Sequence, residues 1–213
     1  MPTLHSRRHG VAAGCLFVAT LALGWPAAGR ATGDHVHHHP QHHATAPAAG
    51  EGLARRVVQV RIPDVPVQQH DGRKLRFVQQ LQGDAPVLLN FIYTSCTAIC
   101  PPMTQILAHT QQILGGPAQQ QVRMISVSLD PERDTAARMA EFAGRFEAGG
   151  QWQFDTGSQA TSEAIQRAFG VYNPDLMSHT PTTFVRPRGA THWVRLDGFA
   201  TPAQLIQEAM GGH

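Results

Sequence analysis

The hydrophobic pattern of this chain alternates between short, nearly continuous apolar runs and longer amphipathic stretches. The clearest run covers residues 86–93 and is interrupted only by Asn90. Apolar residues on both faces of a strand are typical of the buried centre of a mostly parallel sheet. We therefore predict a central strand at 86–93, with residues 122–129 as the next strand.

A helix is predicted shortly after the first of these strands. Pro101 and Pro102 suit its first turn, where a backbone N–H has no partner within the helix, and Gly115 and Gly116 suit its end. Apolar residues at helical spacing indicate the face that contacts the core. This predicted core stripe consists of Met103, Ile106, Leu107, Ile113 and Leu114.

The rest of the pattern continues the alternation of helices and strands. Asp134 or Thr135 is the predicted N-cap of a second helix, whose inner face carries Met139, Phe142 and Phe146. This order predicts an α/β sandwich with right-handed crossovers. Two further helices are expected at 158–169 and 201–210, and three further strands at 152–154, 182–185 and 192–196.

The segment before the central strand has a different pattern. Residues 53–67 contain short β-favouring runs broken by prolines, and His70-Asp71-Gly72-Arg73 is typical of a hairpin turn. We expect this segment to form an N-terminal hairpin extension that pairs at an edge of the sheet.

The overall charge argues against one class of partner. The 213-residue chain has a formal net charge of +2, and its Lys and Arg residues are scattered rather than grouped on one helix. A nucleic-acid-binding protein is expected to carry a clustered basic face. We therefore predict no nucleic-acid partner. The length favours one folded domain with an unstructured arm.

Residues 1–31 have the composition of an export signal. Arg7 and Arg8 precede an apolar stretch at 11–25, and small residues follow around Ala28. The stretch is shorter than the roughly 20 apolar residues that a membrane span needs, so a cleaved signal is favoured over a retained membrane anchor. We predict an exported, periplasmic protein, with the N-terminus as a membrane tether in the alternative case. Twin-arginine and lipoprotein export routes both stay open.

Residues 32–52 lack apolar periodicity and are predicted to be a disordered arm rather than part of the core. Closely spaced neutral imidazoles chelate divalent copper, zinc or nickel. We therefore assign the arm an auxiliary role in metal capture, and a solubilising linker is the alternative. The histidines concerned are His35, His37, His38, His39, His42 and His43.

Cys96 and Cys100 form a CxxxC pair where the central strand is expected to run into the first helix. Backbone N–H groups and the helix dipole lower the pKa of a thiol at such a position. Helical residues four positions apart have Cα atoms about 6 Å apart, and a disulfide tolerates up to roughly 7 Å. The two sulfurs can therefore share a soft metal ion or act as a redox-active dithiol. A structural disulfide is the simplest alternative.

The motifs around this pair resemble those of the Sco/SenC family of copper proteins. Pro101 follows the second cysteine, and three residues separate the two cysteines where thioredoxins have two. Thr180-Pro181 enters a late strand, as in the thioredoxin-like layout. The stretch 126–135, which reads Ser-Val-Ser-Leu-Asp-Pro-Glu-Arg-Asp-Thr, is similar to the signature after the family's next strand, and residues 196–199 match the stretch before its last helix.

The resemblance covers residues 53–213 and implies a thioredoxin-like, three-layer α/β sandwich with a central mixed sheet. It also places His179 at the family's ligand position. Cys96, Cys100 and His179 are therefore the expected ligands of copper, because thiolates suit Cu(I) and an imidazole also accommodates Cu(II). Family members commonly carry Pro-Asp between the cysteines, where this chain has Thr97-Ala98-Ile99.

The family's role implies a partner, namely the copper subunit of a respiratory oxidase or another copper protein. A member delivers copper to the oxidase's binuclear copper centre or reduces the cysteines of that centre. We therefore expect a copper chaperone rather than an enzyme, and the histidine arm favours this reading. The alternative is an exported thiol-disulfide oxidoreductase acting on exchange partners, with Cys96 as nucleophile and Cys100 as resolving thiol. A peroxidase is disfavoured.

Several other polar or sulfur-containing residues are interpreted structurally. Asp130 and Asp134 are expected to be loop and capping residues. Met103 and Met177 have the chemistry of thioether ligands, but Met103 falls on the helix stripe, and both are left out of the predicted site.

Overall fold

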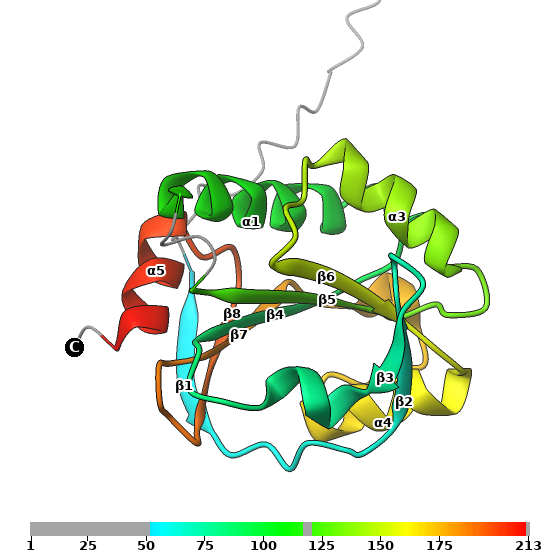
Figure 1. Ribbon diagram of the computed structural model, residues 1–213, viewed down its shortest axis with the longest axis horizontal. Coiled ribbons are helices and arrows are strands. Elements are labelled where there is room, and N and C mark those ends of the chain that lie inside the picture. Colours follow the sequence, from blue (N-terminus) through cyan, green and yellow to red (C-terminus); the bar gives the residue numbers. More distant parts are fainter. Residues whose placement is uncertain (1–51, 117–120, 212–213) are drawn as a thin grey trace, which may run out of the picture. The chain divides into compact units, whose positions relative to one another are not determined.

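One mixed sheet organises the described part of the chain. The computed structural model describes residues 52–116 and 121–211, in which eight strands have the order β1-β8-β7-β4-β5-β6-β2-β3 (Figure 1). β4 (Val87–Ile92), β5 (Arg123–Ser128) and β6 (Trp152–Thr156) are parallel to one another. β7 (Thr182–Arg186) pairs antiparallel with β4, and β8 (Trp193–Asp197) pairs antiparallel with β7. The predicted α/β class with a central mixed sheet is confirmed.

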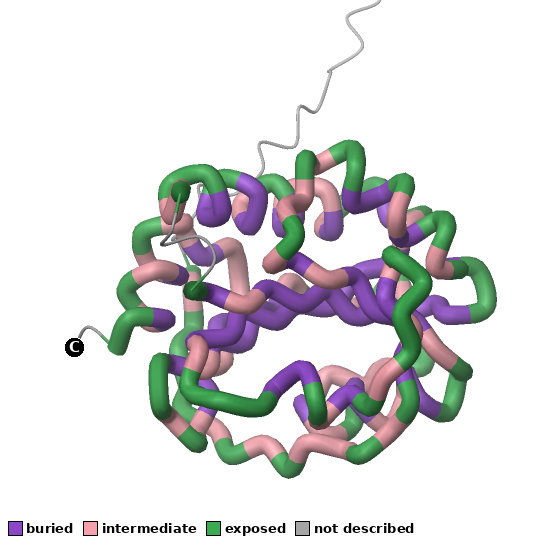
Figure 2. Tube along the Cα trace, viewed as in Figure 1, coloured by how far each residue is buried: buried purple, intermediate pink, exposed green. Residues whose placement is uncertain are grey.

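The core is centred on β4, the strand that the apolar run predicts. Every residue of β4 is buried, and β5 is buried at all positions but its first. In Figure 2 the buried residues run along most of the length of these central strands. The polar Asn90 is partly satisfied, because its side-chain oxygen accepts a hydrogen bond from Ser126 Oγ at 2.6 Å while its amide nitrogen has no partner among the described residues. A buried polar side chain is tolerated when it has such a partner.

The segment before β4 reaches both edges of the sheet. β1 (Ala54–Val58) pairs antiparallel with β8 at one edge, whereas β2 (Pro66–Gln69) pairs with β6 at the other. β3 (Lys74–Arg76) completes a hairpin with β2 across the predicted turn, in which Gly72 has a φ of 90°. The predicted hairpin is therefore confirmed as β2–β3 at one edge of the sheet, whereas β1 of the same segment lies at the opposite edge.

Helices cover both faces of the sheet, giving three layers (Figure 1). One face carries α1 (Cys100–Leu114) and α3 (Ala136–Arg145), and the other carries the 3-10 turn η1 (Phe77–Leu81) and α4 (Gln159–Ala168). α5 (Pro202–Met210) packs against α1 and β7. A second 3-10 turn, η2 (Leu176–Ser178), precedes β7.

Side-chain caps fix the starts of three helices. The N-caps of α3, α4 and α5 are Thr135, Ser158 and Thr201, and each accepts a hydrogen bond from a backbone N–H in its first turn. Such caps satisfy donors that have no partner inside the helix. The choice between Asp134 and Thr135 is thereby settled in favour of Thr135.

The predicted core stripe of α1 is partly wrong. Met103 and Leu107 are buried, but Ile106 and Leu114 are only half-buried and Ile113 is 64% exposed. The buried face instead includes Gln111, whose side-chain oxygen accepts a hydrogen bond from Gly149 N and whose amide donates to Glu147 O. Thr104 and Thr110 are also buried, because their hydroxyls bond to backbone oxygens one turn earlier. These hydrogen bonds let polar residues occupy the inner face.

The predicted export signal at 1–31 and the histidine arm, up to residue 51, lie outside the described residues. Within residues 52–116 and 121–211, no helix is both long enough and apolar enough to cross a membrane.

The burial pattern of α1 predicts that two similar truncations change the free energy of unfolding by very different amounts. Leu107→Ala is expected to lower the free energy of unfolding by about 2–5 kcal/mol, because it opens a cavity in the core. Ile113→Ala, on the exposed side of the same helix, is expected to change it by less than about 0.5 kcal/mol. Urea unfolding of the reduced protein measures both values. Equal losses would contradict the orientation of α1 described here.

Candidate functional site

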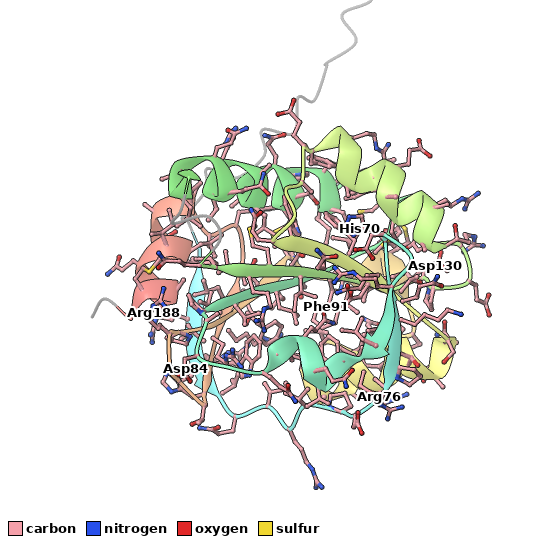
Figure 3. The ribbon with its side chains drawn as sticks, in the orientation of Figure 1. His70, Arg76, Asp84, Phe91, Asp130 and Arg188 are labelled. Carbon is pink, nitrogen blue, oxygen red and sulfur yellow. The ribbon has the colours of Figure 1, made fainter. Side chains whose placement is uncertain are left out.

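The candidate site lies where β4 passes into α1, at the carboxyl end of the parallel strands. A turn follows β4, closed by a hydrogen bond from Cys96 N to Tyr93 O at 3.1 Å, and α1 begins at Cys100. Ligand sites of open α/β sheets commonly occupy this edge. Asp130, labelled in Figure 3, lies at the same end of the sheet just after β5.

Two prolines shape the start of α1. A helix leaves its first four N–H groups without partners inside the helix, but Pro101 and Pro102 have no N–H to offer. Met103 N already donates to Ile99 O at 3.2 Å. Cys100 N is therefore the only donor within the first three positions of α1, and it donates to Cys96 Sγ at 3.3 Å. The sulfur of Cys96 thus takes the place of a capping oxygen.

The surroundings of Cys96 favour its thiolate. Burial alone would raise the pKa of the Cys96 thiol, but hydrogen bonds from the Cys100 thiol, from Cys100 N and Ala98 N and from the Tyr93 hydroxyl outweigh it. The pKa of Cys96 is therefore lowered from its ordinary value. Hydrogen bonds to the charged form of a group stabilise that form. These hydrogen bonds explain why the pKa of a thiol is lowered where the strand passes into the helix, as predicted from the sequence.

Cys100 has the opposite character. Its pKa is raised well above the ordinary range of a thiol, first because it is buried, then because its thiol donates to Cys96 and because Asp134 carries a nearby negative charge. Both cysteines are free, with exposed fractions of 6% for Cys96 and 1% for Cys100. The predicted pair is thus brought together as a dithiol with one activated and one protected sulfur.

Asp134 anchors the loop that carries this pair, a role that differs from the capping role expected from the sequence. Its carboxylate is buried and accepts hydrogen bonds from Thr94 N at 3.1 Å, Thr94 Oγ1 at 2.6 Å and Ser128 Oγ at 2.7 Å. These bonds tie the exit of β4 to the exit of β5. The signal in the sequence was the polar stretch directly after the strand next to β4, because the carboxyl ends of neighbouring parallel strands meet.

Tyr93 is a further site residue that the sequence reasoning missed. It is buried, and its hydroxyl bonds to Cys96 and lies 3.8 Å from Met177 Sδ. Burial, reinforced by the neighbouring thiols, raises the pKa of Tyr93 to about 12, so the hydroxyl keeps its proton. Its position at the end of the central strand, three residues before Cys96, was the available signal.

His179 is the predicted ligand that the structure does not join to the thiols. It follows η2, is half-buried, and its N–H donates to Leu176 O at 3.3 Å. Burial lowers its pKa, which favours the neutral imidazole that binds metals. In the described ranges, no three His, Cys, Asp or Glu residues form a ready-made metal site. The two sulfurs are assembled, whereas His179 stands two residues beyond Met177, on the segment that contacts Tyr93.

The other candidates are placed as follows. Met103 is buried in the core, as expected, and Asp130 is a loop residue that pairs with Arg133 at 2.9 Å. The arm histidines His35, His37, His38, His39, His42 and His43 lie outside the described residues.

The dithiol geometry supports two kinds of chemistry. A thiolate beside a protected thiol, both shielded from water, can bind a soft metal ion once Cys100 gives up its proton. The same pair can carry out thiol-disulfide exchange, in which the low-pKa sulfur attacks and the buried sulfur resolves the mixed disulfide.

The chain is similar in sequence to a curated protein. The SCO1 protein homolog of Bacillus subtilis (strain 168) is 36% identical over 91 residues, which cover 42% of this chain and 46% of that protein. The chain therefore spans less than half the length of this curated relative.

Solved structures share the fold. BsSco, described as a member of the Sco family of cytochrome c oxidase assembly proteins with a disulfide switch, superposes with a TM-score of 0.61 at 23% identity, covering 74% of this chain and 96% of its own. Bradyrhizobium japonicum ScoI, solved with copper bound, has a TM-score of 0.56 at 23% identity and covers 71% of this chain and 99% of its own. These likenesses confirm the thioredoxin-like fold class.

The family assignment follows from a match over most of the chain. The model of the SCO1/SenC family matches residues 67–209, which include β4, the dithiol loop, the residues around Asp134 and the segment of His179. The chain belongs to the SCO1/SenC family.

Proposed function

We propose that this protein is a copper chaperone that carries copper on Cys96 and Cys100. The observation that carries the proposal is the pair of free, buried sulfurs at the start of α1, one with a lowered and one with a raised pKa. Thiolates are the preferred ligands of Cu(I). Membership of the SCO1/SenC family and a related protein solved with copper bound support the same cargo.

The receiving partner is the copper subunit of a respiratory oxidase or another copper protein, and the cargo goes to its binuclear copper centre. Support comes from the description of BsSco as a member of a family of cytochrome c oxidase assembly proteins. Alternatively, the protein assists assembly of the same centre by reducing its cysteines. The dithiol then attacks a partner disulfide, becomes a disulfide itself, and leaves two thiols on the partner.

His179 would complete a set of ligands for Cu(II). Its imidazole is favoured in the neutral form by burial, as metal binding requires. Because it does not form a cluster with the two thiols, its ligation requires the segment around η2 to move toward Cys96. We expect the two sulfurs to hold Cu(I) without it.

A thiol-disulfide oxidoreductase without copper delivery is a second candidate. The specific observation in its favour is the split between the pKa values of the two thiols, which matches a nucleophile and a resolving thiol. The arm at 32–52 favours copper delivery, since six histidines would collect a metal and a reductase has no need of them. We propose that the signal at 1–31 takes the protein out of the cytoplasm, to the periplasm, with or without a membrane anchor.

Alkylation is expected to separate the two thiols. At neutral pH, iodoacetamide should modify Cys96 and spare Cys100, because the pKa of Cys96 is lowered while burial raises that of Cys100. The modification rate should rise with pH through a midpoint below that of an unstructured cysteine. Mass spectrometry of the peptides around residues 96 and 100, in the Cys100→Ser and Cys96→Ser variants, reports each thiol of the pair separately from Cys15. Equal alkylation rates in the two variants would contradict the assignment of Cys96 as the activated thiol and Cys100 as the protected one.

Copper uptake distinguishes the two candidate functions. In a full chain whose six arm histidines are replaced by glutamine, the anaerobically reduced protein is expected to hold about one equivalent of Cu(I) on two thiolates. Cys96→Ser and Cys100→Ser should each abolish it, whereas Ser95→Ala, an exposed change in the same loop, should not. Metal analysis after gel filtration measures the content. A chain that holds no copper but reduces disulfides would establish the oxidoreductase instead.

The role of His179 is testable through the oxidation state of the metal. In the chain whose six arm histidines are replaced by glutamine, His179→Ala is expected to lose Cu(II) binding and keep Cu(I) binding, because only the cupric ion needs the imidazole beside the two sulfurs. His109→Ala, an exposed histidine on α1, serves as the control. Electron paramagnetic resonance detects Cu(II), and a Cu(I)-specific chelator competition measures Cu(I). Unchanged Cu(II) binding would exclude His179 from the site.

A further inference from the structure

In the part of the chain that the structure describes, an exposed methionine contacts Tyr93, the neighbour of the buried dithiol. Met177, in the 3-10 turn η2, has an exposed fraction of 81%, the largest among the exposed large hydrophobic residues of the described ranges. A single exposed methionine is unremarkable by itself. Its position is notable because Met177 Sδ lies 3.8 Å from the hydroxyl of Tyr93.

That hydroxyl connects Met177 to the dithiol. Tyr93 also bonds through its side chain to Cys96, so a thioether, a phenol and a thiol follow one another from the surface to the buried pair. Cys96 and Cys100 have exposed fractions of only 6% and 1%, so Met177 is by far the most accessible of these three sulfur-containing residues.

The turn that carries Met177 is held in place by Asp175. Asp175 Oδ1 accepts a hydrogen bond from Met177 N at 3.0 Å, and Asp175 Oδ2 accepts one from Ser178 Oγ at 2.6 Å. These bonds lower the pKa of Asp175 and keep it a carboxylate at neutral pH. The thioether therefore stands on an ordered turn beside a negative charge that attracts cations.

We propose that Met177 is the entry ligand for Cu(I), which it binds at the surface and passes to Cys96. The inference rests on the proposed copper function. A thioether is a soft, uncharged donor and holds Cu(I) less strongly than a thiolate does. In the transfer, the bond from copper to Met177 Sδ breaks as the bond to Cys96 Sγ forms, and copper stays Cu(I) throughout. Cys100 then binds and releases its proton to water.

The test compares Met177→Leu with Met210→Leu, a matched change at another exposed methionine on α5. Both are made in the reduced full chain whose arm histidines are replaced by glutamine. Stopped-flow mixing with a Cu(I)–chelator complex measures the rate of uptake. Met177→Leu is expected to slow uptake at least about fivefold with unchanged final occupancy, and Met210→Leu to leave the rate unaltered.

A second readout detects the contact directly. In the Cys96→Ser/Cys100→Ser chain, isotope-labelled methionine methyl groups are followed by nuclear magnetic resonance during titration with Ag(I), a redox-inert substitute for Cu(I). The methyl signal that Met177→Leu removes is expected to shift, and that of Met210 to stay. Rapid uptake by Met177→Leu, or an unmoved Met177 signal, would overturn the entry role while the copper function stands. A parent chain that takes up no Cu(I) would instead refute the copper function itself.

Discussion

The hydrogen bond from Cys100 N to Cys96 Sγ is the interaction on which the site depends. It exists because two consecutive prolines remove the other donors from the first three positions of α1, so that one N–H points at one sulfur. The same bond positions Cys96 over the helix start and stabilises its thiolate. The consequence is a difference in pKa between two chemically identical side chains, and the proposed order in which the two sulfurs act rests on that difference.

The surrounding fold keeps that contact in place. β4 is buried along its whole length, and Asp134 fastens the loop after β4 to the loop after β5 through Thr94 and Ser128. Asp134 also acts electrostatically, because the negative charge of its carboxylate helps to raise the pKa of the Cys100 thiol. Tyr93, at the end of the same strand, closes the other side of Cys96. Rigid strands thus support the two sulfurs, whereas His179 lies on a separate segment after η2.

Local patterns were sufficient for the features that depend on neighbours in sequence. An apolar run predicted β4, two prolines predicted the start of α1, and the turn residues predicted the β2–β3 hairpin. The hydrophobic pattern wrongly predicted that Ile113 faces the core. Thr104, Thr110 and Gln111 occupy the inner face of α1 instead, because their side chains form hydrogen bonds with backbone atoms. The contacts of Asp134 with Thr94 and of Tyr93 with Met177 join residues 40 and 84 positions apart, beyond the reach of any local pattern.

The pairing of β1 with β8 has a consequence for how the chain acquires its fold. Arg56 on β1 and Asp197 on β8, which form an ion pair, are separated by 141 positions. Closing so long a loop costs conformational entropy that is recovered only when the contacts at its ends form, and such contacts slow folding. The first strand of the described residues therefore cannot pair until the last strand has been synthesised. During that interval the edge of β1 that will pair with β8 stays available to other chains, and unpaired strand edges of this kind favour misassembly.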